Sequence, residues 1–270
     1  MDPKTFQAYR DLVYERSGIN LVPGKESLVS ARIGKRLREL GIADHDSYLQ
    51  HVLDDATGQE ITALLDLIST NVTSFYRESD HFELLEQAVS ERLRTGQTRL
   101  RVWSAACSSG EEPYCIAITL LETLRKRNLR GIDAQVLATD LSTRVLEAGR
   151  RGRYEPQKVE PVPKGVRQRY FARCRVGDHE GYEVVDGLKR MVAFRRLNLS
   201  QPPFPMRGPF DVVFCRNVMI YFDNQVRTRL LREMERLLAP GGLLMVGHSE
   251  SLTGHLCNLQ AVRPSVYCKP

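Results

Sequence analysis

From Leu100 onward, short apolar runs alternate with longer segments in which apolar residues recur at helical spacing. This alternation is typical of an open, mostly parallel sheet, because each parallel strand needs a crossover connection to the next one. The sequence therefore predicts a doubly wound α/β domain. Strands are expected at 100–104, 134–139, 192–198, 211–215, 243–247 and 261–268, and helices at 111–128, 142–150 and 223–238.

The first 75 residues differ, because their apolar residues recur only at helical spacing. Glycine-containing breaks separate four such segments, which favours short helices joined by turns. We therefore expect an all-α domain over 1–75 and the α/β domain over 76–270. The helices are expected at 3–16, 27–40, 45–54 and 58–69.

The alternation lapses between residues 151 and 196, where prolines, basic residues and short β-like pieces such as 181–185 replace it. A lapse of this kind inside an α/β pattern indicates an insertion. We expect a small antiparallel β-subdomain at about 155–195.

Charge and cysteine usage indicate which cellular compartment and which kinds of partner to expect. No apolar run approaches the length of about 20 residues that a membrane span needs, and the first residues lack the apolar core of a signal peptide. The six scattered cysteines include no C-x-x-C pair, and no histidines are spaced for metal binding. We therefore expect a reduced, cytoplasmic protein without a metal. The net charge of +6 favours an acidic partner, which could be protein, nucleic acid or lipid.

A turn of small residues follows the first predicted strand, in the run Trp-Ser-Ala-Ala-Cys-Ser-Ser-Gly-Glu-Glu-Pro at 103–113. Small residues let a ligand approach the backbone, and the amides that open the next helix can donate hydrogen bonds to it. The carboxylates of Glu111 and Glu112 would repel a pyrophosphate but suit the ammonium group of an amino-acid cofactor. This favours S-adenosylmethionine over NAD. The alternative is a plain strand–turn–helix whose acidic residues complement the helix dipole.

Polar side chains also follow two later strands. Asp140 ends the second strand, where an open α/β sheet presents a carboxylate to a ribose, although an aspartate there is often only a helix cap. The apolar strand at 211–215 delivers Arg216, Asn217 and Tyr221 to its carboxyl end, where ligands bind in this architecture. Packing alone hardly explains such polar groups. With the first turn, they predict a cofactor site at this edge of the sheet.

Four sequence blocks together resemble one known family. They are Thr-Asn-Val-Thr-Ser-Phe-Tyr-Arg-Glu at 70–78, the turn at 103–113, Phe-Cys-Arg-Asn-Val-Met-Ile-Tyr-Phe at 214–222 and Val-Gly-His-Ser-Glu at 246–250. In this order they resemble the signature blocks of CheR chemoreceptor glutamate methyltransferases, and the likeness covers nearly the whole chain. The resemblance implies a Rossmann-like class I methyltransferase domain with an inserted antiparallel β-subdomain, preceded by an all-α domain.

The same resemblance implies a function and a set of cofactor contacts. It implies methyl transfer from S-adenosylmethionine to glutamates in the acidic helical region of transmembrane chemoreceptors, for sensory adaptation, by a monomer that does not enter the membrane. Of the two adjacent glutamates, we expect Glu111 to face the cofactor. By motif position, the implied contacts are Asn71, Thr73, Arg77, Glu111 or Glu112, Asp140 on the ribose hydroxyls, and Asn198, Leu199, Arg216 and Asn217 on the adenosine side.

Two residues are candidates for the reacting centre. A solvated glutamate has a pKa near ~4.3, so a substrate carboxylate is already ionised at neutral pH and needs no general base. We expect Arg77 to orient that carboxylate through charge-assisted hydrogen bonds and Tyr221 to contact the substrate or the surroundings of the methyl group. The alternatives are an interdomain salt bridge for Arg77 and a half-buried packing aromatic for Tyr221. His248 is expected to have a structural role.

Two surfaces are candidates for docking a receptor. The helix at 27–40 has an apolar stripe and a basic side, which is usually a solvated face, but the resemblance implies that it docks the acidic methylation helix. The β-subdomain, at about 167–195 with a turn at 177–181, can in this family tether a receptor C-terminal peptide by strand addition, and is otherwise a lid or spacer. The basic residues of the helix are Arg32, Lys35, Arg36 and Arg38, and its stripe is Val29, Ile33, Leu37 and Leu40.

Two other functions are compatible with a basic chain of this fold. A nucleic-acid methyltransferase often carries an Asn/Asp-Pro-Pro-aromatic segment to hold a flipped base. The corresponding strand end here reads Cys-Arg-Asn-Val-Met-Ile-Tyr at 215–221, which disfavours that function. A scaffold without turnover is the second alternative, and the presence of Arg77, Asp140, Asn217 and Tyr221 argues against it.

Overall fold

The computed structural model describes residues 1–252 and 258–270. Its N-terminal helices form a small domain around fully buried side chains such as Tyr9, Ile33 and Leu64. The first helix begins where the Asp2 carboxylate accepts the amides of Lys4 and Thr5 and ends at the left-handed Gly18. The four helices are α1 (Pro3–Ser17), α2 (Glu26–Leu40), α3 (His45–Asp54) and α4 (Gln59–Ile68), close to the predicted bounds.

The remainder is built on a seven-stranded sheet of order β6-β2-β1-β7-β8-β10-β9. The first five strands in this order are parallel, whereas β10 runs antiparallel to β8 and to β9. This confirms the predicted doubly wound α/β fold. The strands are β1 (Arg99–Ser104), β2 (Asp133–Asp140), β6 (Val192–Arg196), β7 (Phe210–Cys215), β8 (Leu238–Val246), β9 (Gln260–Arg263) and β10 (Val266–Cys268).

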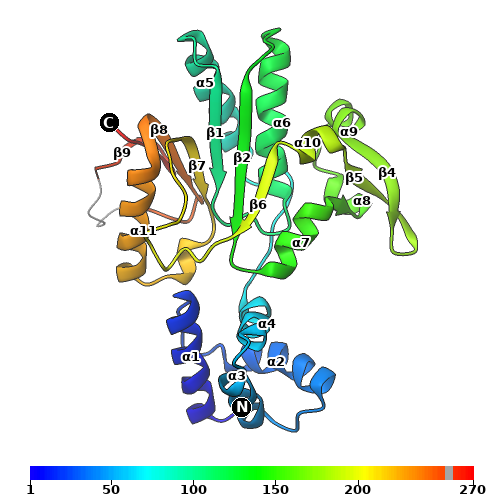
Figure 1. The fold of residues 1–270 in the computed structure, drawn as a ribbon, viewed down its shortest axis with the longest axis vertical. Coiled ribbons are helices and arrows are strands. Elements are labelled where there is room, and N and C mark those ends of the chain that lie inside the picture. Colours follow the sequence, from blue (N-terminus) through cyan, green and yellow to red (C-terminus); the bar gives the residue numbers. More distant parts are fainter. Residues whose placement is uncertain (253–257) are drawn as a thin grey trace.

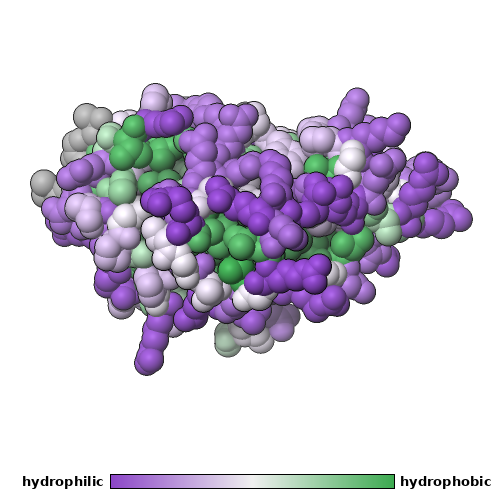
Figure 2. Space-filling model, turned by 90° about the horizontal axis from the view of Figure 1, so that it is seen from above, coloured by the Kyte–Doolittle hydropathy of each residue, from purple (hydrophilic) through white to green (hydrophobic). Residues whose placement is uncertain are grey.

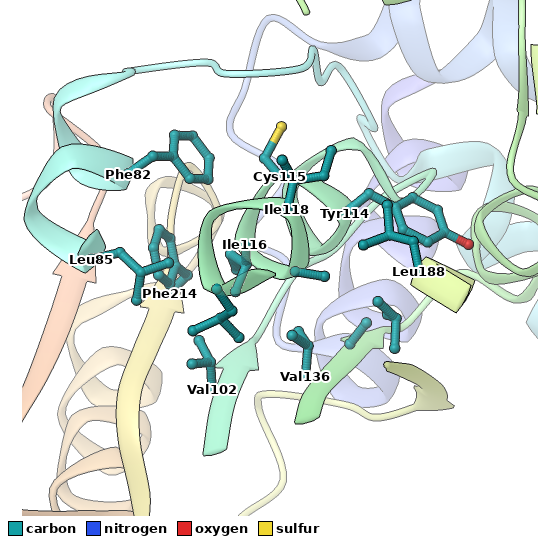
Figure 3. Packing of buried hydrophobic residues seen from close by; sticks show 14 of the residues in the cluster. Phe82, Leu85, Val102, Tyr114, Cys115, Ile116, Ile118, Val136, Leu188 and Phe214 are labelled. Atoms are coloured by element: carbon teal, nitrogen blue, oxygen red, sulfur yellow. The ribbon is translucent and has the colours of Figure 1, made fainter. Parts of the chain in front are cut away.

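Helices cover both faces of the sheet, as Figure 1 shows. Side chains of α5 (Asp80–Arg94) and α6 (Glu111–Lys126) pack in one hydrophobic core, part of which is drawn in Figure 3. Side chains of α11 (Asn224–Leu237) pack in a second core with Trp103 and Val213. Alternate residues of each central strand enter opposite cores, as the two-residue period of a strand requires.

Two predictions about the α/β domain were incomplete or wrong. The segment that forms α5 is not among the predicted helices, although α5 buries Phe82, Leu85 and Val89. The single strand expected at 261–268 is instead the β9–β10 hairpin, which reverses at Ser265, where φ is 59°. Helices α6, α7 (Thr143–Arg151) and α11 lie where the alternation predicted them.

The predicted inserted β-subdomain is present as a separate three-stranded antiparallel sheet of order β3-β5-β4. Its turn at Gly177 and Asp178 joins two long strands, and β4 forms an open edge. The elements are β3 (Arg153–Tyr154), α8 (Pro156–Val159), α9 (Lys164–Tyr170), β4 (Phe171–Val176), β5 (His179–Val184) and α10 (Asp186–Lys189).

The surface is largely polar on the face drawn in Figure 2, where hydrophilic side chains separate small apolar patches. Within the described part of the chain, no helix is long and apolar enough to cross a membrane. The five cysteines described are all free. Cys257 and His255 lie outside the described residues.

Candidate functional site

A pocket of about 930 Å³, its open mouth included, lies where the carboxyl ends of the central strands face the helical domain. Ser17 and Ile19 at the end of α1 contribute to its wall, together with the linker at 69–77. The fold thus brings most of the predicted site residues to one cavity. Those that line it are Asn71, Thr73, Arg77, Glu112, Asp140, Asn198, Leu199, Arg216, Asn217 and Tyr221.

The turn between β1 and α6 is built from residues with small side chains. Gly110 has a φ of 98°, and a Cβ at this position would lie 2.9 Å from the Tyr154 hydroxyl and 3.0 Å from the Gly149 Cα, so only glycine fits. Ala105, Ala106 and Ser108 then leave the floor of the pocket without bulky side chains.

Asp140 links this turn to the one that follows β2. Its carboxylate accepts the backbone amides of Ser108 and Ser142, both at 2.9 Å. Burial raises the pKa of the Asp140 carboxyl, although these amides favour its charged form. The helix-cap alternative does not describe this geometry, because Ser142 is the residue that caps α7. Asp140 lines the pocket with its carboxylate held in place from two sides.

The preference for Glu111 as the inward-facing glutamate needs correction to Glu112. The Glu111 side chain is fully buried and bonds Lys158 at 2.8 Å and Ser109 at 2.7 Å, and it does not line the pocket. Glu112 does line it, with Ser104 Oγ at 2.7 Å and Arg216 Nη1 at 3.0 Å. Neighbouring residues on a helix point about 100° apart, so only one of the two can face the cavity.

Arg216 is the buried centre of an ionic network at one end of the pocket. Its side chain is 2% exposed, and it bonds Glu112 at 3.0 Å and Glu78 at 3.1 Å. Burial alone would raise the pKa of Glu78, but Arg216 and Asn217 outweigh burial and hold the pKa below its ordinary value. Burial raises the pKa of Glu112 despite the same arginine. The Arg216 side chain therefore bonds these carboxylates and the Arg77 carbonyl, and none of its hydrogen bonds within the described residues is to Asn198 on the implied adenosine side.

Arg77 and Tyr221, the two candidates for the reacting centre, both line the pocket. The Arg77 guanidinium donates to the Val72 carbonyl at 2.9 Å, and it forms no salt bridge with any described residue. The interdomain salt bridge considered for Arg77 is thus absent from the described structure. Tyr221 ends the short helix η1 (Met219–Tyr221), and its carbonyl accepts the Asn20 amide at 2.8 Å while its side chain lines the cavity.

The side chains of Asn71 and Asn198 differ in their hydrogen bonding. The Asn71 Nδ2 is buried without a hydrogen-bond partner among the described residues, and Asn71 lines the cavity. A buried polar group without a partner is rare in proteins and is expected where a ligand supplies the partner. The Asn198 side chain instead donates to the Arg16 carbonyl at 2.8 Å and accepts the Ser200 amide at 3.0 Å. Asn198 therefore also fastens the helical domain to the sheet.

The four basic residues of α2 do not form one free face. Arg36 bonds the buried Glu60 carboxylate at 2.9 and 2.7 Å, and Arg32 donates to Ile68 and Thr70 near the linker. These two arginines hold α2 against its own domain. Lys35 and Arg38 are exposed. The predicted apolar stripe also ends early, because Leu40 is 37% exposed.

Glu78, His81 and His248 offer ligand atoms within 4.8 Å of one another, which could hold a metal ion. His81 is fully buried, and burial together with the Arg216 charge lowers its pKa to about 4. Arg216 already bonds the Glu78 carboxylate, so the positive charge opposes a cation there. His248 bonds Asp80 at 3.2 Å, which agrees with a structural role.

The predicted site residues do not include Glu78, Glu250 or the end of α1, although all of these contribute to the site. Glu78 and Glu250 both lie inside the family-like blocks at 70–78 and 246–250, which was the available signal. Nothing in the local sequence of Ser17 or Ile19 indicates that they would close a pocket formed mainly by a distant sheet.

Comparisons with known proteins identify the family of this chain. The family model "CheR methyltransferase, SAM binding domain" matches residues 71–268, and "CheR methyltransferase, all-alpha domain" matches residues 4–69. The chemotaxis protein methyltransferase of Escherichia coli (strain K12) is 42% identical over 92% of this chain and 84% of its own length. Chemotaxis protein methyltransferase 2 of Pseudomonas aeruginosa is 38% identical over 97% of this chain and 91% of its own.

The strand order and these matches together define an S-adenosylmethionine-dependent methyltransferase with a Rossmann-like fold. Within that class, the chain belongs to the CheR methyltransferase family.

Proposed function

We propose that this protein transfers methyl groups to glutamate side chains in the acidic cytoplasmic helices of chemoreceptors, forming methyl esters for sensory adaptation. The relatives named above are chemotaxis methyltransferases, which supports a receptor as the substrate. The observation that carries the proposal is a pocket that combines inward carboxylates with a half-buried, salt-bridge-free Arg77. We further propose that it acts in the cytoplasm as a monomer.

The residues of the pocket suit the cofactor, which supplies a methyl group activated by a sulfonium. The carboxylate of Asp140 can accept the ribose hydroxyls, and that of Glu112 can face the ammonium group. The side-chain amide of Asn71, which has no hydrogen-bond partner among the described residues, can donate a hydrogen bond to the cofactor. Leu199, which is buried in the second core, offers an apolar wall to the adenine ring. In this proposal the ribose hydroxyls and the ammonium group of the cofactor each meet a carboxylate.

The remaining groups act on the substrate. Arg77 can pair with the incoming glutamate carboxylate and hold one oxygen toward the methyl group, and the exclusion of water by the filled pocket strengthens this pairing. No proton must be removed, because the carboxylate is ionised at neutral pH. Accordingly, no histidine lines the pocket among the residues described. The Tyr221 hydroxyl can contact the substrate at the same place.

The chemical identity of the product tests the proposal. The protein is incubated with methyl-labelled cofactor and either a receptor signalling fragment or RNA. We expect label on the receptor fragment that is released by mild base, as a carboxyl methyl ester requires. Label on RNA would support the nucleic-acid alternative, and no transfer to either would favour a scaffold without turnover. Either result would contradict the proposal.

Lys35 and Arg38 are the α2 residues that can meet an acidic receptor helix. Reversing both charges, Lys35→Glu with Arg38→Glu, is expected to raise the KM for a receptor fragment roughly tenfold at low salt, because each exposed pair contributes up to about 1 kcal/mol. The effect should shrink as salt screens the charges. Steady-state kinetics at two ionic strengths measure it.

The matched control reverses two exposed arginines on other helices, Arg94 on α5 and Arg125 on α6, for the same change in net charge. An equal rise in KM for the control would show a general charge effect, and an unchanged KM in the α2 variant at low salt would contradict docking.

Arg36→Ala is expected to lower the unfolding midpoint of the protein, because it leaves the buried Glu60 carboxylate without its cation.

The open edge of β4 is the proposed site for a receptor C-terminal peptide. The backbone groups on the outer side of β4 have no neighbouring strand in this sheet and are available for strand addition. The neighbouring side chains Arg173 and Arg175 lie on this strand and add positive charge beside the edge.

A further inference from the structure

The carboxylate of Glu250 is buried immediately behind the cofactor pocket and is bound by backbone amides. Glu250 follows β8 and is 8% exposed. One carboxylate oxygen accepts the amides of Asn217 at 2.8 Å and Gly247 at 2.7 Å. The other accepts the amides of Val218 at 3.0 Å and Ile220 at 3.3 Å. No lysine, arginine or histidine among the described residues forms a salt bridge with it.

The segment that these amides belong to is a wall of the pocket. Arg216, Asn217, Val218 and Tyr221 line the cavity, whereas Glu250 does not. Asn217 has a φ of 57°, a left-handed conformation that is uncommon for residues with a side chain and persists when the surroundings hold it. The amides of Asn217 itself and of the next residue both end on the Glu250 carboxylate.

The turn after β8 fits directly against the turn after β7. A Cβ at Gly247 would lie 2.5 Å from Asn217 Nδ2, 2.8 Å from a Glu250 carboxylate oxygen and 3.0 Å from the Asn217 amide nitrogen. These distances leave no room for a side chain. The position of Asn217 is therefore set by the neighbouring strand, through Gly247 and Glu250.

A carboxylate is the group that suits this arrangement. Each oxygen accepts two N–H groups, and an ionised carboxylate can accept about four hydrogen bonds while donating none. A glutamine would turn its NH₂ group toward two amides, where donor would face donor. The negative charge also strengthens each bond.

We infer that Glu250 is a positioning residue for methyl transfer, which holds the segment 216–221 in the conformation that presents Arg216 and Asn217 to Glu78 and Tyr221 to the pocket. The Asn217 side chain donates to Glu78 at 3.3 Å, which joins the segment to the ionic network. The inference deepens the proposed function and rests on it for the rate measurement, whereas its effect on cofactor affinity is independent of the receptor.

The test compares Glu250→Gln with Glu233→Gln in the full chain. Glu233 is also a buried carboxylate that accepts a backbone amide, that of Phe204 at 2.7 Å, but Phe204 does not line the pocket, whereas Asn217 and Val218 do. Both variants are expected to lower the unfolding midpoint. Only Glu250→Gln should lower kcat and raise the Kd for S-adenosylhomocysteine, each by about tenfold, as the loss of a positioned group does.

Amide hydrogen exchange supplies a readout that general destabilisation does not move selectively. The amides of Asn217 and Val218 are expected to exchange faster in Glu250→Gln relative to core amides of β7, and to be unaffected in Glu233→Gln. Equal losses of activity in the two variants, or kcat and Kd within twofold of the parent in a folded Glu250→Gln, would overturn the inference.

A second variant reaches the same junction from the other side. Gly247→Ala places a methyl group against Asn217 while Glu250 stays intact. It is expected to reproduce the loss of kcat and of cofactor affinity, and it serves as the deciding variant should Glu250→Gln fail to fold. Unchanged kinetics in Gly247→Ala would then overturn the inference. If the parent protein methylated no receptor, the proposed function would fail, and the cofactor Kd values would still test the role of Glu250.

Discussion

Replacing Arg77 with alanine is expected to lower the rate of methyl transfer to a receptor fragment by about 10²-fold, with little change in the unfolding midpoint. The guanidinium lines the pocket and has no carboxylate partner among the described residues, so its removal leaves no buried charge unpaired. Loss of one preorganised donor at a reacting centre typically costs about 10²–10³ in kcat. Initial rates with labelled cofactor, at saturating concentrations of both substrates, measure the effect.

Arg94→Ala is the matched control, because this exposed arginine on α5 pairs with Glu91 of its own helix and with no other described acidic residue. Its turnover should equal that of the parent. Arg77→Lys separates charge from shape, since lysine keeps the charge but lacks the planar fork, and we expect an intermediate rate. A folded Arg77→Ala enzyme with normal turnover would remove this residue from the reacting centre.

The second large effect is expected at Asp140. Changing this residue to asparagine should raise the Kd for S-adenosylhomocysteine by about 10- to 100-fold, because hydrogen bonds to a charged group contribute about 1.5–3 kcal/mol. The variant loses the charged acceptor for the ribose hydroxyls. It also turns an NH₂ group toward one of the amides of Ser108 and Ser142. Titration calorimetry measures the change.

Asp133→Asn is the corresponding control at the opposite end of β2. Asp133 is an exposed first residue of the strand and pairs with Arg101, far along the strand from the pocket. Its affinity for the cofactor product should match that of the parent. Equal affinities for Asp140→Asn and the parent would show that this carboxylate does not hold the ligand.

The sequence predicted the positions of the sheet and of the polar residues that follow its strands, because both depend on short-range patterns. Apolar runs define the strands, and polar residues directly after the strands must lie at the carboxyl edge of a parallel sheet. Asp140, Asn217 and Tyr221 needed nothing more than this rule to be placed at one pocket. Asn71, Thr73, Arg77, Asn198 and Leu199 were expected only from the family resemblance.

Long-range contacts determine the side-chain directions and partners that the sequence patterns did not predict. The direction of Glu111 depends on Lys158, a residue of the inserted subdomain 47 positions away. The use of Arg36 depends on Glu60, which lies on another helix. The spacing of residues in a helix shows which side chains share a face, but it does not show which residues of other elements contact that face.

Two errors had signals that were present in the chain. Phe82, Leu85 and Val89 recur at the spacing of a helix that buries one side, and this pattern predicts α5 when it is counted. Pro264 interrupts the segment expected to be one strand, and a proline in a central strand removes a ladder hydrogen bond. The hairpin between β9 and β10 is the consequence.

The ligand that the pocket binds is the most direct evidence for or against an S-adenosylmethionine site. Titration calorimetry with S-adenosylmethionine, S-adenosylhomocysteine and NAD tests it in a single experiment. We expect saturable binding of both adenosyl compounds at one site, competition between them and no measurable binding of NAD. Tight binding of the dinucleotide, with no affinity for either adenosyl compound, would contradict the account.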